Sequence, residues 1–246
     1  MSVLENGYLS DPDTQAHFDR IQRDIDLLDY KIYRSYPDKH VHTGPFAGMR
    51  LCEDPFWLDG NMMVRLMGRY EHELWPVVEK AIARQPKSVL NIGCCEGYYA
   101  VGFALRLPSV RMIWACDILS EAIRCTNDAA VLNHVSDRVT GFVLDRGASA
   151  DLELPCLIVI DNEGSEEDTI RRLKVLQADF IVECHDFLKP GTTDRIVKML
   201  EPTHEVERIS SRWDEELIKA QPSVLQAIVV GEKRSKNACW LAAWQK

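Results

Sequence analysis

The stretch Ser88-Val-Leu-Asn-Ile-Gly-Cys-Cys-Glu-Gly-Tyr-Tyr-Ala-Val-Gly-Phe-Ala104 decides the fold. The run 88–92 has the pattern of a buried strand, and a turn with Gly93 and Gly97 follows before a helical pattern begins. Gly93 allows a tight backbone turn, and Gly97 allows a ligand or the sheet itself to come close. This order of strand, glycine turn and helix indicates a binding site for a nucleotide-type ligand.

An acidic residue strengthens this interpretation. The next apolar run is followed by Asp117, twenty residues beyond Gly97. In Rossmann-like sheets, an acid in this position faces the ribose hydroxyls of the ligand. Two glycines alone are weak evidence, because ordinary strand-to-helix turns also use glycine. The strand, the turn, the helix and the acid together predict a Rossmann-like α/β sheet.

The rest of the chain alternates short apolar runs with helical stretches. The runs lie at residues 88–92, 111–116, 139–144, 156–160 and 180–184. Each has the length of a strand buried on both faces, and most of the gaps between them are long enough for a helix. This alternation predicts a mostly parallel sheet flanked by helices. Further strand candidates lie at residues 204–209, 225–230 and 238–244.

The N-terminal third has a different pattern. Residues 11–34 predict an amphipathic helix, and residues 63–84 predict a second one. Proline and glycine interrupt residues 36–60, so we expect an irregular segment that covers or lines a site. We therefore predict a helical, lid-like extension over residues 1–85 and a Rossmann-like core over residues 86–246, within one compact domain.

The composition limits the classes of partner. The chain has 246 residues and a net charge of −9, which disfavours nucleic acid and anionic membranes. No run approaches the ~20 apolar residues of a membrane helix, and the first residues lack the pattern of a signal peptide. We expect a cytoplasmic protein with a small-molecule partner and with no nucleic acid or membrane; a homodimer stays open.

The cysteines do not predict a disulfide framework or a zinc site. Eight are present, without a Cys-x-x-Cys pair. Cys94, Cys116, Cys156 and Cys184 lie within apolar runs or at their ends, where a free thiol behaves as a small buried hydrophobe. We predict that they are reduced.

Two residues of the glycine turn distinguish between candidate cofactors. A dinucleotide site needs Gly-x-Gly-x-x-Gly, so that backbone N–H groups can bind a pyrophosphate. Cys95 occupies the middle glycine position, and Glu96 would place a negative charge beside the phosphates. S-adenosylmethionine carries a sulfonium cation and no phosphate, so this charge does not repel it. The turn therefore favours S-adenosylmethionine over NAD.

At this point a family resemblance emerges. Asn91-Ile-Gly-Cys-Cys-Glu-Gly-Tyr-Tyr-Ala-Val-Gly resembles the cofactor motif of class I methyltransferases, and more narrowly that of FkbM-type enzymes, whose loop reads Gly-x-Ala-Glu-Gly. The likeness runs from about residue 43 to 210 and includes Gly44-Pro-Phe-Ala-Gly-Met49, Gly68-Arg-Tyr-Glu-His-Glu-Leu74, Asp161-Asn-Glu-Gly-Ser-Glu166 and Glu183-Cys-His-Asp-Phe187. It implies a seven-stranded sheet with an antiparallel last strand, and methyl transfer as the chemistry.

The resemblance also implies a set of donor-binding residues. Asp145 would lie near the adenine ring, while Tyr70 and Glu71 would close over the methionine end. A surface turn for Asp145 and core packing for Tyr70 are the alternatives. Asn91 stands where class I enzymes commonly have an acid, which weakens the contact to the methionine amine, and Cys95 tightens the pocket. The other implied contacts are Gly93, Cys94, Glu96, Gly97, Asp117 and Ile118.

The run 156–160 ends in acidic residues. Asp161 and Glu163 follow it directly, at the edge where ligands bind in open α/β sheets. Glu166, Glu167 and Asp168 fit the start of a helix, where the macrodipole stabilises carboxylates. We therefore predict a site role for Asp161 and Glu163, and a structural role for the three later acids.

The run 180–184 ends in the same kind of cluster. Glu183 and His185 lie two residues apart, so they point to the same side of a strand. A histidine with an ordinary pKa of ~6.5 suits a general base, and Glu183 could orient its ring. We predict that His185, with Asp161, Glu163 and Glu183, forms the catalytic acceptor site; a purely structural hydrogen bond is the alternative for His185.

Asp161 and Glu183 also suggest a divalent ion. Oxygen ligands from two strand ends suit Mg²⁺, which would lower the pKa of a bound diol. Some class I methyltransferases bind a metal at these strand ends and carry a further acid beside the second ligand. Cys184 stands there in this chain. We therefore assign no metal ligand, and a Mg²⁺ ion between Asp161 and Glu183 stays open as the alternative.

The function that these patterns favour is O-methylation of a small-molecule or sugar hydroxyl by S-adenosylmethionine. An N-methyltransferase acting on an amine or peptide stays open, because the same acids could accept a proton from an amine. A non-catalytic binding protein is a third hypothesis, suggested by Asn91 and Cys95. An NAD-linked oxidoreductase is disfavoured by Glu96. Phe46, Met49 and Trp57 could stack on an acceptor, although buried packing is their plainer role.

Overall fold

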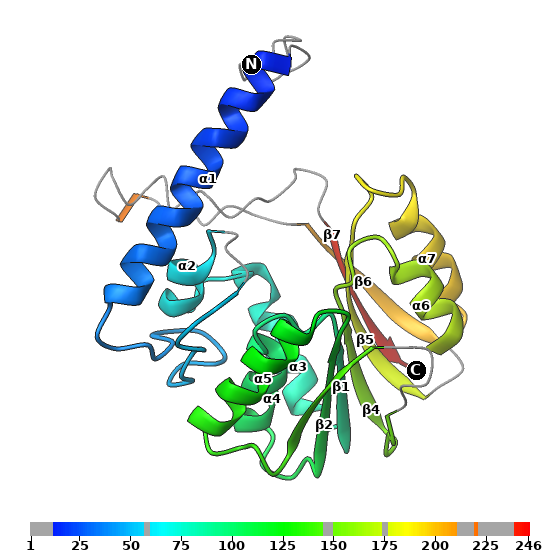
Figure 1. Ribbon diagram of the computed structural model, residues 1–246. Helices are drawn as coiled ribbons and strands as arrows, with labels where there is room; N and C mark the ends of the chain where they lie inside the picture. The colour runs from blue at the N-terminus through cyan, green and yellow to red at the C-terminus, as the bar shows by residue number, and fades with distance from the viewer. Residues whose placement is uncertain (1–11, 57–59, 145–149, 174–176, 211–218, 221–238) are drawn as a thin grey trace.

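The protein forms one seven-stranded sheet with helices on both faces (Figure 1). The computed structural model describes residues 12–56, 60–144, 150–173, 177–210, 219–220 and 239–246. The strands are β1 (Ser88–Ile92), β2 (Met112–Asp117), β3 (Val139–Val143), β4 (Cys156–Ile160), β5 (Ala178–Cys184), β6 (His204–Ser210) and β7 (Cys239–Gln245).

The strand order is β3-β2-β1-β4-β5-β7-β6. The strands β1 to β5 run parallel, and β7 is antiparallel to both β5 and β6. Every residue of β1 and β4 is buried, because helices cover both faces of the sheet. The prediction of a seven-stranded, mostly parallel, Rossmann-like sheet with an antiparallel strand is confirmed.

The helices divide the core into two layers. On one face lie α3 (Trp75–Ala83), α4 (Tyr98–Arg106) and α5 (Ser120–Leu132) (Figure 1). On the other lie α6 (Glu166–Leu173) and α7 (Thr192–Leu200). Residues of β4 alternate between these layers: Leu157 and Val159 pack in the first, and Ile158 and Ile160 in the second.

The N-terminal helix α1 (Pro12–Ser35) confirms the first predicted helix and projects from the body of the molecule (Figure 1). Its C-terminal half is attached through Asp29, which is buried. The Asp29 carboxylate accepts hydrogen bonds from the backbone N–H groups of Met62 and Met63, both at 3.0 Å. These are two of the donors that a helix leaves unpaired at its start, so α1 caps α2 (Met62–Met67).

The prediction of one continuous helix over residues 63–84 is wrong. The structure divides it into α2, a 3₁₀ turn η3 (His72–Leu74) and α3. The division begins at Gly68, whose φ of +77° is left-handed, and a Cβ there would lie 2.0 Å from the Thr43 carbonyl oxygen. Glu71 also has a left-handed φ of 49°. The apolar periodicity does not detect this break, because it counts spacing and not backbone conformation.

Smaller differences affect the other predicted elements. The run predicted at 111–116 is shifted by one residue, and β5 begins two residues before the predicted Phe180. The strand candidate at 225–230 and Trp57 lie outside the described residues. Phe46 and Met49 are buried in the core. All eight cysteines are free, as predicted. Within the described ranges, no helix is long and apolar enough to span a bilayer.

Two glycines allow a test of the helix break. Both Gly48 and Gly68 have positive φ, but a Cβ at Gly48 would meet no atom within 4 Å. We expect Gly48→Ala to cost about 1–2 kcal/mol of unfolding free energy, for the left-handed backbone alone. Gly68→Ala should cost more than about 3 kcal/mol, because Thr43 must also move. Urea denaturation measures both, and equal losses would contradict the close approach.

Candidate functional site

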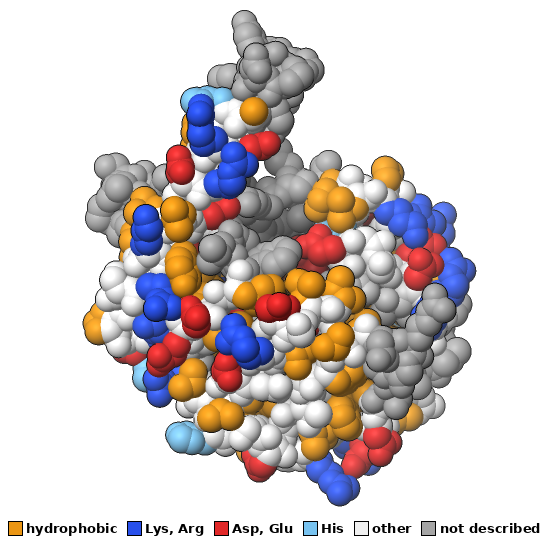
Figure 2. All heavy atoms as spheres, viewed as in Figure 1, with side chains coloured by type: hydrophobic (Ala, Val, Ile, Leu, Met, Phe, Trp, Pro, Cys, Tyr) orange, Lys and Arg blue, Asp and Glu red, His pale blue; other side chains and the backbone are white. Residues whose placement is uncertain are grey.

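One cavity of about 570 Å³ lies at the carboxyl ends of the parallel strands. It includes the point between β1 and β4 where the strand order reverses, the usual ligand site of open α/β sheets. Acidic and apolar side chains lie beside a hollow on the face shown in Figure 2. Residues before and after the boundary that we predict at residue 85 line the cavity.

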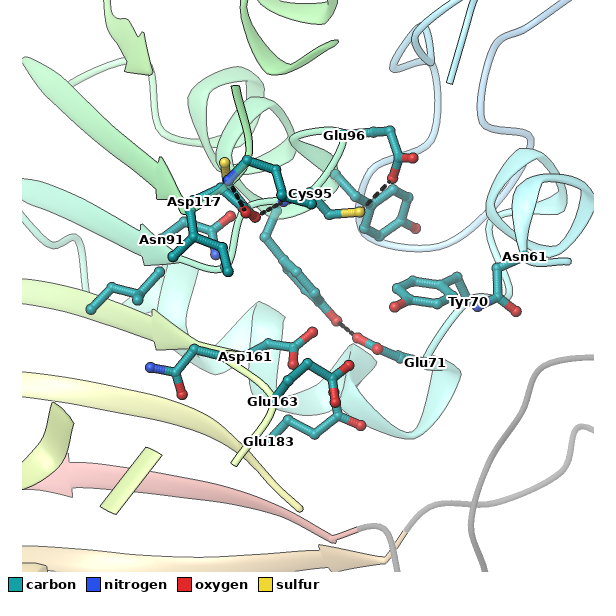
Figure 3. A pocket seen from close by; sticks show the side chains of 18 of the residues that line it. Asn61, Tyr70, Glu71, Asn91, Cys95, Glu96, Asp117, Asp161, Glu163 and Glu183 are labelled. Carbon is teal, nitrogen blue, oxygen red and sulfur yellow. Dashed lines mark hydrogen bonds between the residues drawn. The ribbon is translucent and has the colours of Figure 1, made fainter. Parts of the chain in front are cut away.

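The cavity brings together most of the predicted site residues. Figure 3 shows one group at the ends of β1 and β2, and an acidic group facing it. Of the predicted residues, the following line the cavity: Tyr70, Glu71, Asn91, Gly93, Cys94, Glu96, Asp117, Ile118, Asp161, Glu163, Glu183 and His185. Asp145 lies outside the described residues.

The glycine turn is packed tightly against the neighbouring elements. A Cβ on Gly93 would lie 1.6 Å from the Asp161 carbonyl oxygen, so the turn touches the end of β4. Gly97 is not among the lining residues; a Cβ there would meet Thr126 of α5 at 3.0 Å. Gly97 therefore permits a close approach of the helix α5. From the sequence we expected a ligand or the sheet in this place.

The Asp117 carboxylate is fixed at the cavity wall by two backbone groups. Oδ2 accepts a hydrogen bond from the Cys95 N–H at 3.1 Å, and Oδ1 accepts one from the Leu119 N–H at 3.0 Å. Beside it, Ile118 is 74% exposed, and Leu119 and Leu144 are also exposed. An acid next to an apolar surface can bind a hydroxyl-bearing group attached to a flat ring.

Asn91 presents an unsatisfied polar atom to the cavity. The residue is buried in the middle of the sheet. Its Oδ1 is buried and has no hydrogen-bond partner among the described residues. A buried acceptor without a partner is costly, so the position suits a donor group from a ligand.

A buried ion pair joins α2 to the glycine turn. Arg65 Nη1 lies 2.8 Å from Glu96 Oε2, and both side chains are buried. The Arg65 guanidinium also lies 4.6 Å from the centre of the Tyr70 ring, and the Cys95 thiol donates a hydrogen bond to Glu96. Sequence reasoning missed Arg65 because a continuous helix gave no reason to turn it toward the cavity. The negative charge of Glu96 is therefore balanced by Arg65 within the protein.

Two tyrosines and Glu71 form the opposite wall. The Tyr99 hydroxyl donates a hydrogen bond to the Glu71 carboxylate, and Glu71 is buried (Figure 3). Burial raises the pKa of both Tyr70 and Tyr99, so the hydroxyls stay protonated. Tyr99 was not predicted as a site residue. Its position in the first turn of α4 is the signal that points it toward this wall.

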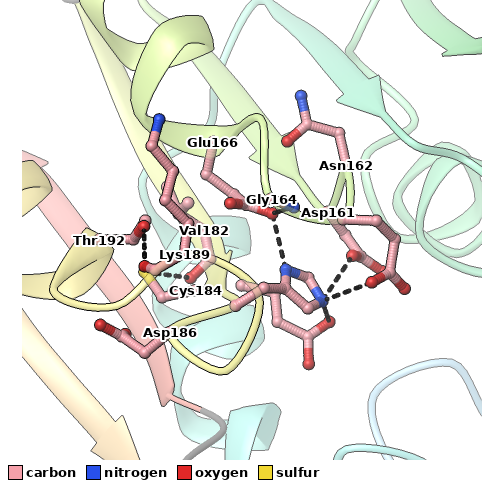
Figure 4. Close-up of polar contacts among 12 residues, drawn as sticks. Asp161, Asn162, Gly164, Glu166, Val182, Cys184, Asp186, Lys189 and Thr192 are labelled. Atoms are coloured by element: carbon pink, nitrogen blue, oxygen red, sulfur yellow. Dashed lines mark hydrogen bonds and ion pairs between the residues drawn. The ribbon is translucent and has the colours of Figure 1, made fainter.

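Four carboxylates surround His185. Its Nε2 faces the cavity, 3.3 Å from Glu163 Oε2, 3.7 Å from Asp161 Oδ1 and 3.8 Å from Glu183 Oε2. Its Nδ1 lies 2.6 Å from Glu166 Oε1 on the far side (Figure 4). Glu166 begins α6, as predicted, but it also makes the shortest contact to the ring, whereas Glu183, which we expected to orient the ring, lies farther away on the Nε2 side.

The pKa of His185 is the outcome of opposing effects. Burial of the ring lowers it, but the hydrogen bond to Glu166 and the charges of Asp161, Glu166 and Glu163 outweigh burial and raise the pKa above its ordinary value. Burial raises the pKa of Asp161 to about 6, and the nearby Glu163 and Glu166 add to this. Asp161 therefore loses its proton at a higher pH than an ordinary aspartic acid, and His185 keeps its proton to a higher pH than an ordinary histidine.

The same cluster could hold a metal ion. Ligand atoms of Asp161, Glu183 and His185 lie within 4.8 Å of one another. Sequence reasoning considered the two acids and missed His185 as a third ligand. Two oxygens and one imidazole nitrogen suit Zn²⁺, Mn²⁺ or Fe²⁺ better than Mg²⁺, which prefers oxygen.

Comparison with known proteins shows the fold. No protein-family model matches the chain, and no curated protein matches it. The O-methyltransferase TomG from Streptomyces achromogenes, solved with SAM, has a TM-score of 0.53 at 15% identity over 76% of this chain and 87% of that one. An O-methyltransferase from Bacillus cereus, solved with SAH, has a TM-score of 0.50 at 11% identity over 78% of this chain and 92% of that one.

The raised pKa of Asp161 predicts a pH-dependent cost in stability. The folded state holds the proton more tightly than the unfolded chain does, so stability falls as pH rises from 3.8 to about 6. We expect Asp161→Asn to increase the unfolding free energy by on the order of 1 kcal/mol at about pH 8, and by less at about pH 5. Urea denaturation with Asp151→Asn, an exposed acid, is the control; equal effects of both variants would contradict the assignment.

Proposed function

We propose that this protein is an S-adenosylmethionine-dependent methyltransferase that methylates a hydroxyl group of a small molecule or sugar. The observation that carries the proposal is a single cavity at the strand-order reversal, with the Asp117 side facing the His185 side. The first has the chemistry to bind a nucleoside, and the second has the chemistry to accept a proton.

The residues present fit the donor. Two backbone N–H groups hold the Asp117 carboxylate at the cavity wall, which supports a contact with ribose hydroxyls, and Ile118 and Leu144 offer an apolar surface for adenine. Asn91 Oδ1, which lacks a protein partner, would accept a hydrogen bond from the donor's ammonium group. Because Glu96 is paired with Arg65, the glycine turn does not place a free charge beside the donor's carboxylate.

The fold agrees with this assignment at the level of the class I methyltransferases. Both solved neighbours described above are O-methyltransferases. The finer likeness to FkbM-type enzymes rests on the motif at Asn91 to Gly102 and on the acidic motifs, and it belongs to the proposal.

In the reaction, the donor supplies a methyl group to an acceptor oxygen. His185 takes the hydroxyl proton at Nε2, which faces the cavity. Loss of this proton makes the acceptor oxygen a stronger nucleophile toward the methyl carbon. Asp161, Glu163 and Glu183 stabilise the imidazolium that results. Tyr70, Tyr99 and Glu71 limit the space around the acceptor and hold it in line with the transferred methyl group.

A second candidate is methylation of an amine. Glu71, Asp161, Glu163 and Glu183 give the acceptor wall an excess of negative charge over His185. Such a wall attracts a protonated amine, which must then lose a proton before it can attack. Product analysis by mass spectrometry on hydroxyl and amine acceptors separates the two reactions.

Donor binding is the first test. Calorimetric titration should detect S-adenosylhomocysteine binding and no NAD⁺ binding. Asp117→Asn should weaken S-adenosylhomocysteine at least about tenfold, because a charge-assisted hydrogen bond to the ribose is lost. Asp128→Asn, a surface acid on α5 paired with Arg124, should leave the affinity unchanged. Absence of binding to the wild-type protein would exclude a methyltransferase.

The proton-acceptor role of His185 makes a kinetic prediction. His185→Gln should lower kcat by on the order of 100-fold or more, with S-adenosylhomocysteine affinity unchanged. In the wild type, the raised pKa keeps the ring protonated to higher pH, so kcat should fall as pH drops through a value above 6.5.

The same assay distinguishes base from metal chemistry. The variant should lose the acidic limb of the pH profile, and wild-type turnover should be the same with EDTA and with added Mg²⁺ or Mn²⁺. Normal kcat in His185→Gln would show that the ring is not the base. Full inhibition by EDTA, reversed by a divalent ion, would assign the cluster to metal binding instead.

A further inference from the structure

Glu166 is an acid at the start of a helix, and its side chain is completely buried. It is the first residue of α6 and lies behind His185 as seen from the cavity. Glu166 does not line the cavity, so it cannot touch a substrate there. It contacts His185, whose ring does line the cavity.

We propose that Glu166 is the positioning residue of the site: it holds His185 so that Nε2 is the nitrogen that accepts the substrate's proton. This inference rests on the proposed function. It assigns a task to an acid that the sequence pattern predicts to serve only the helix start.

The geometry fixes both partners. Glu166 Oε1 lies 2.6 Å from His185 Nδ1 and also accepts a hydrogen bond from the Gly164 N–H at 2.7 Å. An ionised carboxylate is an acceptor only, so Nδ1 must carry a proton to make this bond. The lone pair of the neutral ring is then on Nε2, which faces Glu163 and the cavity.

A helix-capping role alone does not account for Glu166. Its neighbour Glu167 has the same dipole environment and pairs with Arg171 and Arg195. Both acids are buried, but Glu166 pairs with His185, and its Oε2 has no hydrogen-bond partner among the described residues. A buried carboxylate with an unsatisfied oxygen costs stability, whereas a charge behind a histidine supports proton transfer.

The proton balance of the reaction shows what Glu166 supplies. When the acceptor hydroxyl gives its proton to Nε2, the oxygen forms a bond to the methyl carbon and the carbon–sulfur bond of the sulfonium breaks. Nδ1 keeps its proton, so the ring becomes an imidazolium. Glu166 accepts the Nδ1–H hydrogen bond and stabilises this charge, and the proton on Nε2 later leaves to solvent.

The test compares matched variants of adjacent acids. Glu166→Gln keeps the shape of the side chain and removes its charge, and Glu167→Gln makes the same change at the next residue. We expect Glu166→Gln to lower kcat by on the order of 100-fold, with the acceptor KM and the S-adenosylhomocysteine affinity within about threefold of wild type. Glu167→Gln should leave kcat within about twofold.

A spectroscopic measurement tests the same inference without turnover. Two-dimensional ¹⁵N correlation of the histidine rings, with His185→Gln for assignment, reports which nitrogen carries the proton. Wild-type His185 should show the Nδ1–H form when neutral, and Glu166→Gln should show a changed pattern while Glu167→Gln does not. If Glu166→Gln fails to fold, Glu166→Asp, which keeps the charge, should retain the pattern with a partly reduced kcat.

The outcomes separate this inference from the proposed function. Wild-type kcat in Glu166→Gln, or an unchanged ring pattern, overturns the positioning role. A failure of wild-type protein to bind S-adenosylhomocysteine overturns the methyltransferase, while the ring pattern still reports on the Glu166–His185 pair. Loss of donor affinity in Glu166→Gln assigns the residue to structure and overturns positioning.

Discussion

The contact between the glycine turn and the end of β4 is the constraint on which the site depends. Gly93 leaves no room for a Cβ beside the Asp161 carbonyl oxygen, so two neighbouring strand ends meet without a side chain between them. The turn that carries Asn91 and Cys95 is thereby held next to Asp161 and the acids that follow. A larger residue at position 93 would push the glycine turn away from the end of β4 and so separate the two halves of the cavity.

The second organising feature is the pairing of buried charged side chains near the cavity. Arg65 pairs with Glu96 at the glycine turn, and His185 pairs with Glu166 behind the cavity wall. Each pair is buried, and buried pairs contribute little net stability because both charges lose their hydration. Their value lies in fixing side chains: the first pair joins α2 to the turn, and the second fixes the direction of an imidazole ring. Asp161, Glu163 and Glu183 line the cavity beside His185.

Much of the fold was predictable because its signals are local. The run 88–92, the glycines after it and the acid at 117 follow one another along the chain, and apolar runs of strand length mark the sheet. The positions of Asp161, Glu183 and His185 at one edge also follow from the rule that parallel strands end together. The break at Gly68 was not predictable in this way, because the residue that packs against Gly68 is Thr43, which lies in a different segment of the chain. Without the break, Arg65 lies on one continuous helix with Tyr70 and Glu71, and the sequence gives no reason to place Arg65 at the cavity.

The sequence by itself determined the class of fold, the glycine turn, the acid at the end of β2 and the identity of the acids and histidine at two further strand ends. Periodicity and spacing carry that information, since strand burial and strand-end position depend on neighbours along the chain. The tertiary structure decided which acid lies closest to His185, which cation pairs with Glu96 and that Tyr99 joins Tyr70 and Glu71 at the opposite wall. Those choices depend on distances of a few ångströms between elements far apart in sequence. Hydrogen bonds and ion pairs act over such distances, and no local pattern records them.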